Sequence, residues 1–469
     1  MSELEKADVG NQHISRRKFI VGGAAVAGTT LALGCSKQSP EPQDDVTATA
    51  APEPPVTEGL KIEMQYRTLG RTGFKASDIS MGCGRINEPN VIRYAYDHGV
   101  NYFDTAWIYG NGDSETKIGE AMQFMERQKI FITTKLPVEA ETTEQELRDR
   151  LAQSLERLHT DYVDGLLMHG IADVSLLDHE AFRKVGAEWK ADGKVKHLGV
   201  SSHGPRGDEP DSMERVLVAT AEDPRFDLIL IAYNFMNKVE GENVLEVCRE
   251  KQVGVTGMKM APGVLEIEPF DPENPAEPYA GYIKRMVEGG RTREEAVERI
   301  QNWLLEQEAN KEKTQPFLAE YGLKTQDELD RKSILWVLNN PDMATVCISM
   351  PDYDTLDKYL PLTGLKLTQA DAKFLNDYAA LFGSQYCRHA CTSCAGSCPH
   401  DLPVSTIMRY SYYYARQGRE KYAMGKYAKL AGQDGSLCLT CDAPCAGACP
   451  HGVNIQANLF KAHSLLTLA

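Results

Sequence analysis

Eight short apolar runs alternate with amphipathic segments through the middle of this 469-residue chain. Apolar runs of strand length that alternate with helical crossovers are typical of buried parallel strands. Eight such units predict an α/β fold in which a parallel (β/α)8 barrel, a TIM barrel, closes on itself. The expected strands are Ile79–Cys83, Tyr102–Thr105, Ile130–Lys135, Val163–His169, Val195–Ser201, Leu228–Tyr233, Val253–Met258 and Ala344–Ile348.

The connections favour a barrel over an open, doubly wound sheet. An open dinucleotide-binding sheet would place G-x-G-x-x-G after its first strand, whereas this chain has Cys83-Gly84-Arg85 there. A hairpin is expected over Met64–Ser77, and the stretch 261–326 is expected to be a helical insertion at the top of the barrel. The expected helices are Asn90–Asp97, Glu115–Met125, Glu144–Leu158, His179–Lys190, Met213–Ala219, Glu242–Lys251, Thr292–Gln307 and Lys332–Leu338.

The charge of the chain argues against one class of partner. It has 67 acidic and 51 basic residues, which gives a formal net charge of −16. A protein that binds nucleic acid needs a cationic face to neutralise phosphates, and no run of the sequence supplies one. Nucleic acid is therefore not expected as a partner.

Candidate catalytic residues stand where a barrel places its chemistry, at the carboxyl ends of strands. Asp104, Lys135 and His169 end three consecutive expected strands, and Tyr109 follows in the loop after Asp104. Reduction of a carbonyl needs a proton for the oxygen, and a tyrosine can donate it if a nearby cation lowers its pKa from ~10. Lys135 would be that cation, Asp104 would hold it, and His169 would orient the carbonyl.

Each of these residues also has a structural interpretation. Asp104 could cap a helix, and Tyr109 could pack within its loop. Lys135 could extend to the surface, and His169 could be a hydrogen-bonded core side chain. The occurrence of all four at successive strand ends favours a shared site.

Four segments resemble the aldo-keto reductase family. They are Asn101–Gly110, which reads Asn-Tyr-Phe-Asp-Thr-Ala-Trp-Ile-Tyr-Gly, then Thr133-Thr134-Lys135, Leu167-Met168-His169 and the start of the barrel at Tyr66–Gly73. The resemblance spans roughly Met64 to Leu362. It implies that Tyr109 is the general acid, that Asp104, Lys135 and His169 complete a tetrad, and that a hydride passes from NADPH to an aldehyde or ketone.

The same resemblance implies contacts to a nicotinamide cofactor. Ser201 and Ser202 stand where the family has Ser-Asn to hold the carboxamide, and Tyr233-Asn234 matches a second family segment. Lys259 follows Met258, which stands where an aromatic residue usually stacks on the nicotinamide. The segment that usually binds the adenosine phosphate contains Asp352 and Asp354, whose charges would repel a 2′-phosphate. The family cofactor NAD(P)H, and NADPH in particular, therefore fits this sequence poorly.

Eight cysteines form two similar groups near the carboxyl terminus. The groups are Cys387, Cys391, Cys394 and Cys398, followed by Pro399, and Cys438, Cys441, Cys445 and Cys449, followed by Pro450. Bacterial two-cluster ferredoxins use C-x2-C-x2-C-x3-C-P, in which the last cysteine binds the other cluster. Each group here has one gap widened by a residue. The pattern predicts two [4Fe–4S] clusters, and a swap would exchange Cys398 and Cys449 between the groups.

Two other uses of these cysteines remain open. Two four-cysteine zinc sites would tolerate the spacing, and a disulfide framework would suit an oxidising compartment. The paired Cys-Pro endings favour iron–sulfur. Because the stretch Leu402–Ala431 between the groups is tyrosine-rich and helical in pattern, we expect a mainly α-helical ferredoxin-like domain.

The amino terminus resembles an export signal. Ser15-Arg16-Arg17-Lys18-Phe19-Ile20 is followed by an uncharged, small-residue stretch to Gly34, as in twin-arginine (Tat) signals. Leu31–Cys35 resembles a lipobox, which would place a lipid anchor at Cys35. Residues 36–59 are rich in Pro, Ala, Thr, Glu and Asp and are expected to form a disordered linker.

These observations predict four parts: a signal peptide at 1–35, a linker at 36–59, a barrel at 60–375 with its insertion at 261–326, and a cluster domain at 376–469. The favoured interpretation is an exported periplasmic oxidoreductase that interconverts a small carbonyl and an alcohol, with electrons relayed through two clusters to a redox protein partner. The alternatives are an NAD(P)H-dependent reductase with structural clusters and a non-catalytic electron-transfer protein.

Overall fold

A computed structural model describes residues 62–205, 211–262, 271–275, 279–323, 326–388, 391–430 and 432–467. The expected signal peptide, the lipobox and the linker lie outside these ranges. All the described residues belong to one compact unit, Pro54–Ala469. In the described ranges, no helix has both the length and the apolar character needed to cross a membrane.

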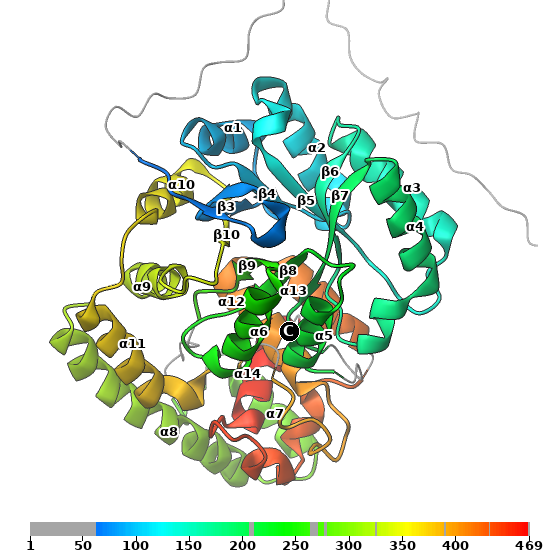
Figure 1. Ribbon diagram of the computed structural model, residues 1–469. Helices are drawn as coiled ribbons and strands as arrows, with labels where there is room; N and C mark the ends of the chain where they lie inside the picture. The colour runs from blue at the N-terminus through cyan, green and yellow to red at the C-terminus, as the bar shows by residue number, and fades with distance from the viewer. Residues whose placement is uncertain are drawn as a thin grey trace, which may run out of the picture. The chain divides into compact units, whose positions relative to one another are not determined.

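Eight parallel strands form a closed barrel, as the sequence predicts. The strands lie in the order β10-β3-β4-β5-β6-β7-β8-β9, so that the last strand pairs with the first (Figure 1). Each expected strand is present, and its ends differ by no more than two residues. The strands are β3 (Ile79–Gly82), β4 (Tyr102–Asp104), β5 (Phe131–Leu136), β6 (Val163–Met168), β7 (Val195–Ser202), β8 (Leu228–Ala232), β9 (Gly254–Met258) and β10 (Thr345–Ser349).

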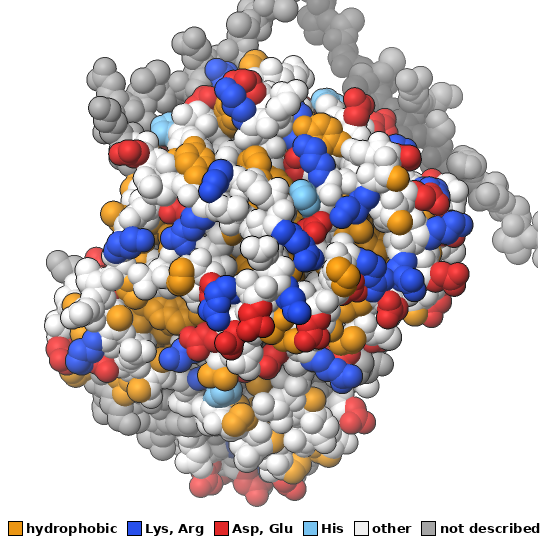
Figure 2. Space-filling model, in the orientation of Figure 1, with side chains coloured by type: hydrophobic (Ala, Val, Ile, Leu, Met, Phe, Trp, Pro, Cys, Tyr) orange, Lys and Arg blue, Asp and Glu red, His pale blue; other side chains and the backbone are white. Residues whose placement is uncertain are grey.

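Helices connect consecutive strands and pack against the outside of the barrel. Their apolar faces and the outward-facing strand residues, such as Val346 and Ile348, share one core. Acidic and basic side chains are interspersed over the face shown in Figure 2. The helices are α1 (Pro89–Asp97), α2 (Asp113–Ala121), α3 (Glu144–Arg157), α4 (Glu180–Ala191), α5 (Met213–Glu222), α6 (Lys238–Lys251), α9 (Gln326–Leu338) and α10 (Tyr353–Tyr359).

The expected hairpin closes the amino-terminal end of the barrel. It consists of β1 (Tyr66–Thr68) and β2 (Lys75–Ser77). Leu69 from its turn packs with inward-facing residues such as Tyr102 and Phe131, whose rings stack with centroids 5.2 Å apart. Side chains therefore fill the amino-terminal end of the barrel.

The carboxyl-terminal region is helical and shares its core with the expected insertion. Its helices are α12 (Val404–Gln417), α13 (Glu420–Tyr427) and α14 (Ile455–Leu466). Tyr282 and Ile283 of α7 (Tyr279–Glu288) and Ile300 of α8 (Arg293–Glu320) pack into one cluster with residues of these helices. The insertion therefore contributes side chains to the apolar core of the cysteine-containing region.

The boundary expected at residues 375 and 376 falls inside a helix. Residues Gln369–Phe382 form α11 (Figure 1), and Phe374 and Phe382 of this helix pack with Phe235 from the loop after β8. Because the boundary region is buried against the barrel, the carboxyl-terminal part is not a separate module on a flexible tether.

The turn of the hairpin provides a stability test. Gly70 has φ +48°, and a Cβ there would lie 2.3 Å from the backbone nitrogen of Gly254, whereas Gly73 has φ +72° and open space around it. Gly73→Ala should therefore cost only the ~1–2 kcal/mol of a left-handed alanine. Gly70→Ala should cost more than about 3 kcal/mol in denaturant unfolding followed by circular dichroism. Equal losses would show that the hairpin is not wedged against the barrel.

Candidate active site

The structure brings the four predicted catalytic residues together above the barrel. Asp104 ends β4, Lys135 lies near the end of β5, and His169 directly follows β6. The Lys135 ammonium donates to Asp104 Oδ1 at 2.5 Å and to the carbonyl of Thr105 at 2.5 Å. Because β4 and β5 are neighbours in the sheet, the pair forms without any long loop.

Tyr109 lies over this ion pair and beside the histidine. Its ring centroid is 5.0 Å from Lys135 Nζ and 5.6 Å from the His169 ring, which meets it edge-on at 82°. A Cβ on Gly84 would lie 3.3 Å from the Tyr109 ring, so this glycine allows close packing under the phenol. Tyr109 and His169 are half-buried, which leaves part of the site accessible.

The electrostatics of the tetrad differ in one respect from the sequence-based expectation. Burial disfavours the Lys135 ammonium, but the Asp104 carboxylate more than offsets this and raises the lysine pKa. For Tyr109, burial raises the pKa, and the opposing effect of Lys135 is too small to reverse the shift. The expected lowering of the tyrosine pKa is therefore wrong for this structure. The phenol stays protonated at neutral pH, as a proton donor must.

Cys347 is a site residue that the sequence analysis missed. A Cβ on Gly82 would lie 3.1 Å from Cys347 Sγ. Burial, followed by the Asp104 carboxylate, raises the pKa of this thiol. The alternation of side chains along β10 could have identified it, because Val346 and Ile348 face the helices and Cys347, between them, faces the barrel interior.

Ser201 and Ser202, the two serines expected to hold a nicotinamide carboxamide, make bonds within the chain. Ser201 Oγ donates to the carbonyl of Met168 at 3.2 Å and accepts from the backbone nitrogen of Gly170 at 2.9 Å. Ser202 Oγ accepts from the backbone nitrogen of Gly204 at 3.4 Å. Both hydroxyls therefore stabilise the strand ends.

The other three expected cofactor residues are also engaged. Tyr233 lies outside the barrel, where it packs on Trp336 and accepts from Asn340 at 3.3 Å. The Asn234 amide donates to the carbonyl of Lys259 at 2.9 Å. The Lys259 ammonium donates to the hydroxyl of Tyr413 on α12 at 3.2 Å. Each of these residues therefore has at least one hydrogen-bond partner within the chain.

Helix α12 meets the barrel loops at this mouth, a contact that the sequence analysis did not predict, although it expected a tyrosine-rich helical stretch there. Arg409 is buried and donates to His203 Nδ1 at 2.8 Å and to the carbonyl of Pro205 at 3.1 Å. Tyr412 donates to the carbonyl of Ala261 at 3.3 Å. These bonds tie α12 to the segments that follow β7 and β9.

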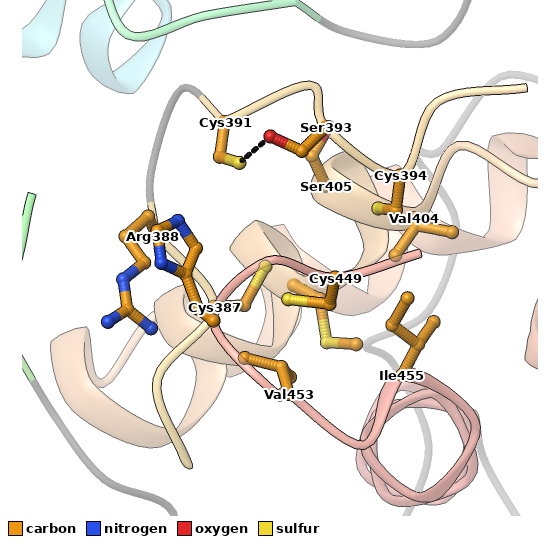
Figure 3. A pocket seen from close by; sticks show the side chains of 12 residues that line it. Cys387, Arg388, Cys391, Ser393, Cys394, Val404, Ser405, Cys449, Val453 and Ile455 are labelled. Carbon is orange, nitrogen blue, oxygen red and sulfur yellow. Dashed lines mark hydrogen bonds between the residues drawn. The ribbon is translucent and has the colours of Figure 1, made fainter. Parts of the chain in front are cut away.

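One pocket gathers four cysteines from both sequence groups. Cys387, Cys391, Cys394 and Cys449 line it, and Figure 3 shows their side chains around a common space. Burial raises the pKa of the Cys387 thiol, and the other three cysteines add to this shift. This is the grouping that the swapped arrangement predicts, with Cys449 joining the first group.

The remaining four cysteines form a second neighbourhood. Burial raises the pKa of Cys438, and Cys398, Cys445 and Cys441 act on the same thiol. Arg299 of α8 donates to the carbonyl of Cys441 at 2.6 Å. No disulfide joins the eleven cysteines in the described residues, and no group of three or more His, Cys, Asp or Glu there is arranged to hold a single metal ion.

Comparisons with known proteins identify a family and several proteins that this chain resembles. Residues 85–266 match the model of the aldo/keto reductase family. A protein of Glycine max named "Probable aldo-keto reductase 1" is 28% identical over 46% of this chain and 67% of its own length. D-threo-aldose 1-dehydrogenase of a Pseudomonas species is 28% identical over 35% of this chain and 60% of its own length. An aldo-keto reductase from Klebsiella pneumoniae, solved with NADPH, aligns with a TM-score of 0.44 and 16% identity over 67% of this chain and 95% of that one.

The barrel and the family match define an oxidoreductase of the (β/α)8 class. Residues 85–266 of the chain are similar to the aldo/keto reductase family. The matched residues 85–266 include all four members of the tetrad and end within the first residues of the insertion, so the family match does not extend to the two cysteine groups.

The buried ion pair gives a test that needs no substrate. Lys135→Met should lower the free energy of unfolding by about 3–5 kcal/mol, because it leaves the Asp104 carboxylate buried without its cation. The double variant Asp104→Asn/Lys135→Met should lose less than the two single losses combined, measured by denaturant unfolding. Lys129→Met, at an exposed lysine paired with Glu126, is the control and should change little. Additive losses at the buried pair would contradict the coupling.

Proposed function

We propose that this chain is an exported oxidoreductase that interconverts a small carbonyl compound and an alcohol, with electrons relayed through two [4Fe–4S] clusters to or from a redox protein. The observation that carries the proposal is the position of α12. It joins the mouth of the barrel to the region that holds the cysteine pocket.

A continuous series of contacts leads from the first cysteine pocket to the tetrad. Cys387 follows Tyr386, whose hydroxyl accepts from the Asn234 amide at 3.4 Å. The same amide donates to the carbonyl of Lys259, and the ammonium of that lysine bonds to Tyr413. Tyr413 in turn acts electrostatically on the pKa of Tyr109. Hydrogen bonds therefore join the segment beside the pocket to Tyr413, and Tyr413 interacts with the tetrad through its charge.

The tetrad supplies the proton chemistry. Tyr109 donates its phenolic proton to the carbonyl oxygen, and His169 orients that oxygen from the edge of the ring. Lys135, held by Asp104, stabilises the negative charge left on the phenolic oxygen. Reduction of a carbonyl takes up two electrons and two protons. Tyr109 would supply one proton and solvent water the other, while two four-cysteine groups, each holding a one-electron carrier, would pass on the two electrons from the redox protein one at a time.

The two sets of four cysteines offer the thiol ligands that iron–sulfur clusters need. The first pocket offers four thiols from two separate segments and an apolar wall that includes Val404, Val453 and Ile455. Iron–sulfur clusters are bound by four cysteine thiolates, and in two-cluster ferredoxins the fourth comes from the other motif. When bound, a cluster accepts or supplies one electron. The first group with Cys449, and the second group with Cys398, would each hold one.

A second candidate is an NAD(P)H-dependent reductase whose clusters only stabilise the fold. The family match and the intact tetrad favour it. The engagement of Ser201 and Asn234 within the chain counts against it. The third candidate is a non-catalytic electron-transfer protein. It does not explain why the chain keeps the buried Asp104–Lys135 pair beside Tyr109.

The proposed location is the periplasm. The support is the Arg16-Arg17 signal, because the twin-arginine route carries proteins that have already folded around their cofactors. A lipid at Cys35 would hold the protein at the membrane surface. A redox partner in the same compartment would then exchange electrons with the clusters.

Loss of the proton donor is the test of the catalytic proposal. Tyr109→Phe removes only the hydroxyl and should lower turnover of a carbonyl substrate by about 10²–10⁴-fold, the usual contribution of general acid catalysis. The measurement is reduction by the anaerobically purified protein with a chemically reduced electron donor, repeated with NADPH and NADH. Tyr66→Phe, at an exposed tyrosine of the hairpin, is the matched control. Unchanged turnover in Tyr109→Phe would exclude the tetrad, and turnover with NADPH alone would favour the second candidate.

The cluster arrangement predicts which variants behave alike. The purified chain should contain about eight irons. Cys449→Ser and Cys394→Ser should disturb the same reduced-state electron paramagnetic resonance signal, because both residues line one pocket. Cys441→Ser should disturb the other signal. If Cys449→Ser instead resembles Cys441→Ser, the swapped arrangement is wrong, and zinc without iron would rule out both clusters.

A further inference from the structure

Three cationic side chains meet at the rim of the barrel mouth. Arg85 comes from the loop after β3, Lys259 from the residue after β9, and Arg419 from the junction of α12 and α13. Arg85 Nε donates to Ser349 Oγ at 3.3 Å. A Cβ on Gly418 would lie 3.8 Å from Arg85 Nη1, so this arginine extends from the barrel to the helix junction.

Tyr413 connects the other two cations. Lys259 Nζ lies 4.8 Å from the centroid of its ring, and the guanidinium carbon of Arg419 lies 5.4 Å from the same centroid. Tyr413 also acts on the pKa of Tyr109, so Lys259 and Arg419 lie around a ring that interacts electrostatically with the candidate proton donor. Arg85, Lys259 and Arg419 are each half-buried, so part of each side chain is exposed to solvent.

The two arginines are not neutralised by ion pairs. Among the residues described, neither Arg85 nor Arg419 lies within ion-pair distance of a carboxylate; Arg419 stacks on Tyr413 and Tyr422 instead. Asp352 and Glu420 are the acidic residues whose charges act on Arg85. Asp352 already caps α10 by accepting from the backbone nitrogen of Thr355 at 2.9 Å. Like charges therefore stand close together in a chain whose net charge is −16.

The backbone at Lys259 adds an independent observation. Lys259 has φ +56°, a left-handed conformation that costs a lysine free energy. The Asn234 amide fixes this conformation by donating to the Lys259 carbonyl. Residues held in such conformations cluster at binding and catalytic sites. At Lys259, this backbone conformation occurs together with the placement of the side-chain ammonium beside Tyr413.

We propose that Arg85, Lys259 and Arg419 form an anion-binding subsite, so that the carbonyl or alcohol substrate of this chain carries a carboxylate or phosphate group. The reacting carbon would lie at Tyr109 and the anionic group at the rim. The substrate assignment rests on the proposed function, whereas binding of the anion does not. Arginine and lysine recognise carboxylate and phosphate by charge-assisted hydrogen bonds.

Binding measurements on the full chain, purified anaerobically, test the subsite. Calorimetric titrations would use pyruvate as an anionic carbonyl, acetone as a neutral one, and inorganic phosphate. Pyruvate and phosphate should bind saturably and more weakly at high salt, and acetone should not bind measurably. Arg85→Gln and Arg419→Gln should each weaken pyruvate binding by about tenfold or more, and Arg85→Lys should retain most of it.

The matched control is Arg249→Gln, which removes one positive charge from α6 at an arginine paired with Asp342. It should leave pyruvate binding unchanged. Equal affinity for pyruvate in wild type, Arg85→Gln and Arg419→Gln would overturn the subsite. Loss of NADPH binding in those variants, with pyruvate binding intact, would also overturn it, because the cations would then serve a dinucleotide. Pyruvate binding that depends on both arginines in a protein that reduces no carbonyl would support the subsite and reject the proposed function.

Discussion

The ammonium of Lys135 is buried inside the barrel, where a single carboxylate, that of Asp104, stabilises its charge. Lys135 and Asp104 are both almost fully buried, and neither charge would be stable there alone. The pairing of β4 with β5 brings the two together, and the Thr105 carbonyl accepts a second hydrogen bond from the ammonium. Tyr109 and His169 then take their positions over this fixed charge. The closed barrel therefore also positions the site, because the register between β4 and β5 determines where the Lys135 ammonium lies.

The second constraint is the attachment of the carboxyl-terminal region. Arg409 is buried, and its guanidinium must find acceptors; it finds them in His203 and in the backbone at Gly204 and Pro205. Meanwhile α7 and part of α8, which are barrel insertions, share an apolar core with α12 and α14. A displacement of α12 would break both sets of contacts. The cysteine pockets are therefore part of the same folded unit as the catalytic residues.

The sequence predicted the barrel closely because its signal is local. Each strand is a short apolar run, and each turn into a helix is marked by polar residues, so Asp104, Lys135 and His169 could be placed at strand ends without knowing any long-range contact. The contacts of α12 could not be predicted in this way. Arg409 and Tyr413 reach residues more than 150 positions away, and nothing near them in the sequence indicates which loop they meet. The same holds for Arg85 and Arg419, which only the tertiary fold brings together.

Burial and charge act in opposite directions on the pKa of the Tyr109 phenol. A tyrosine whose pKa is lowered toward neutrality could act equally as acid and as base. Burial outweighs Lys135 at Tyr109 and keeps its hydroxyl protonated, which suits donation to a carbonyl oxygen. Lys135 becomes useful after the transfer, when it stabilises the phenolate that remains.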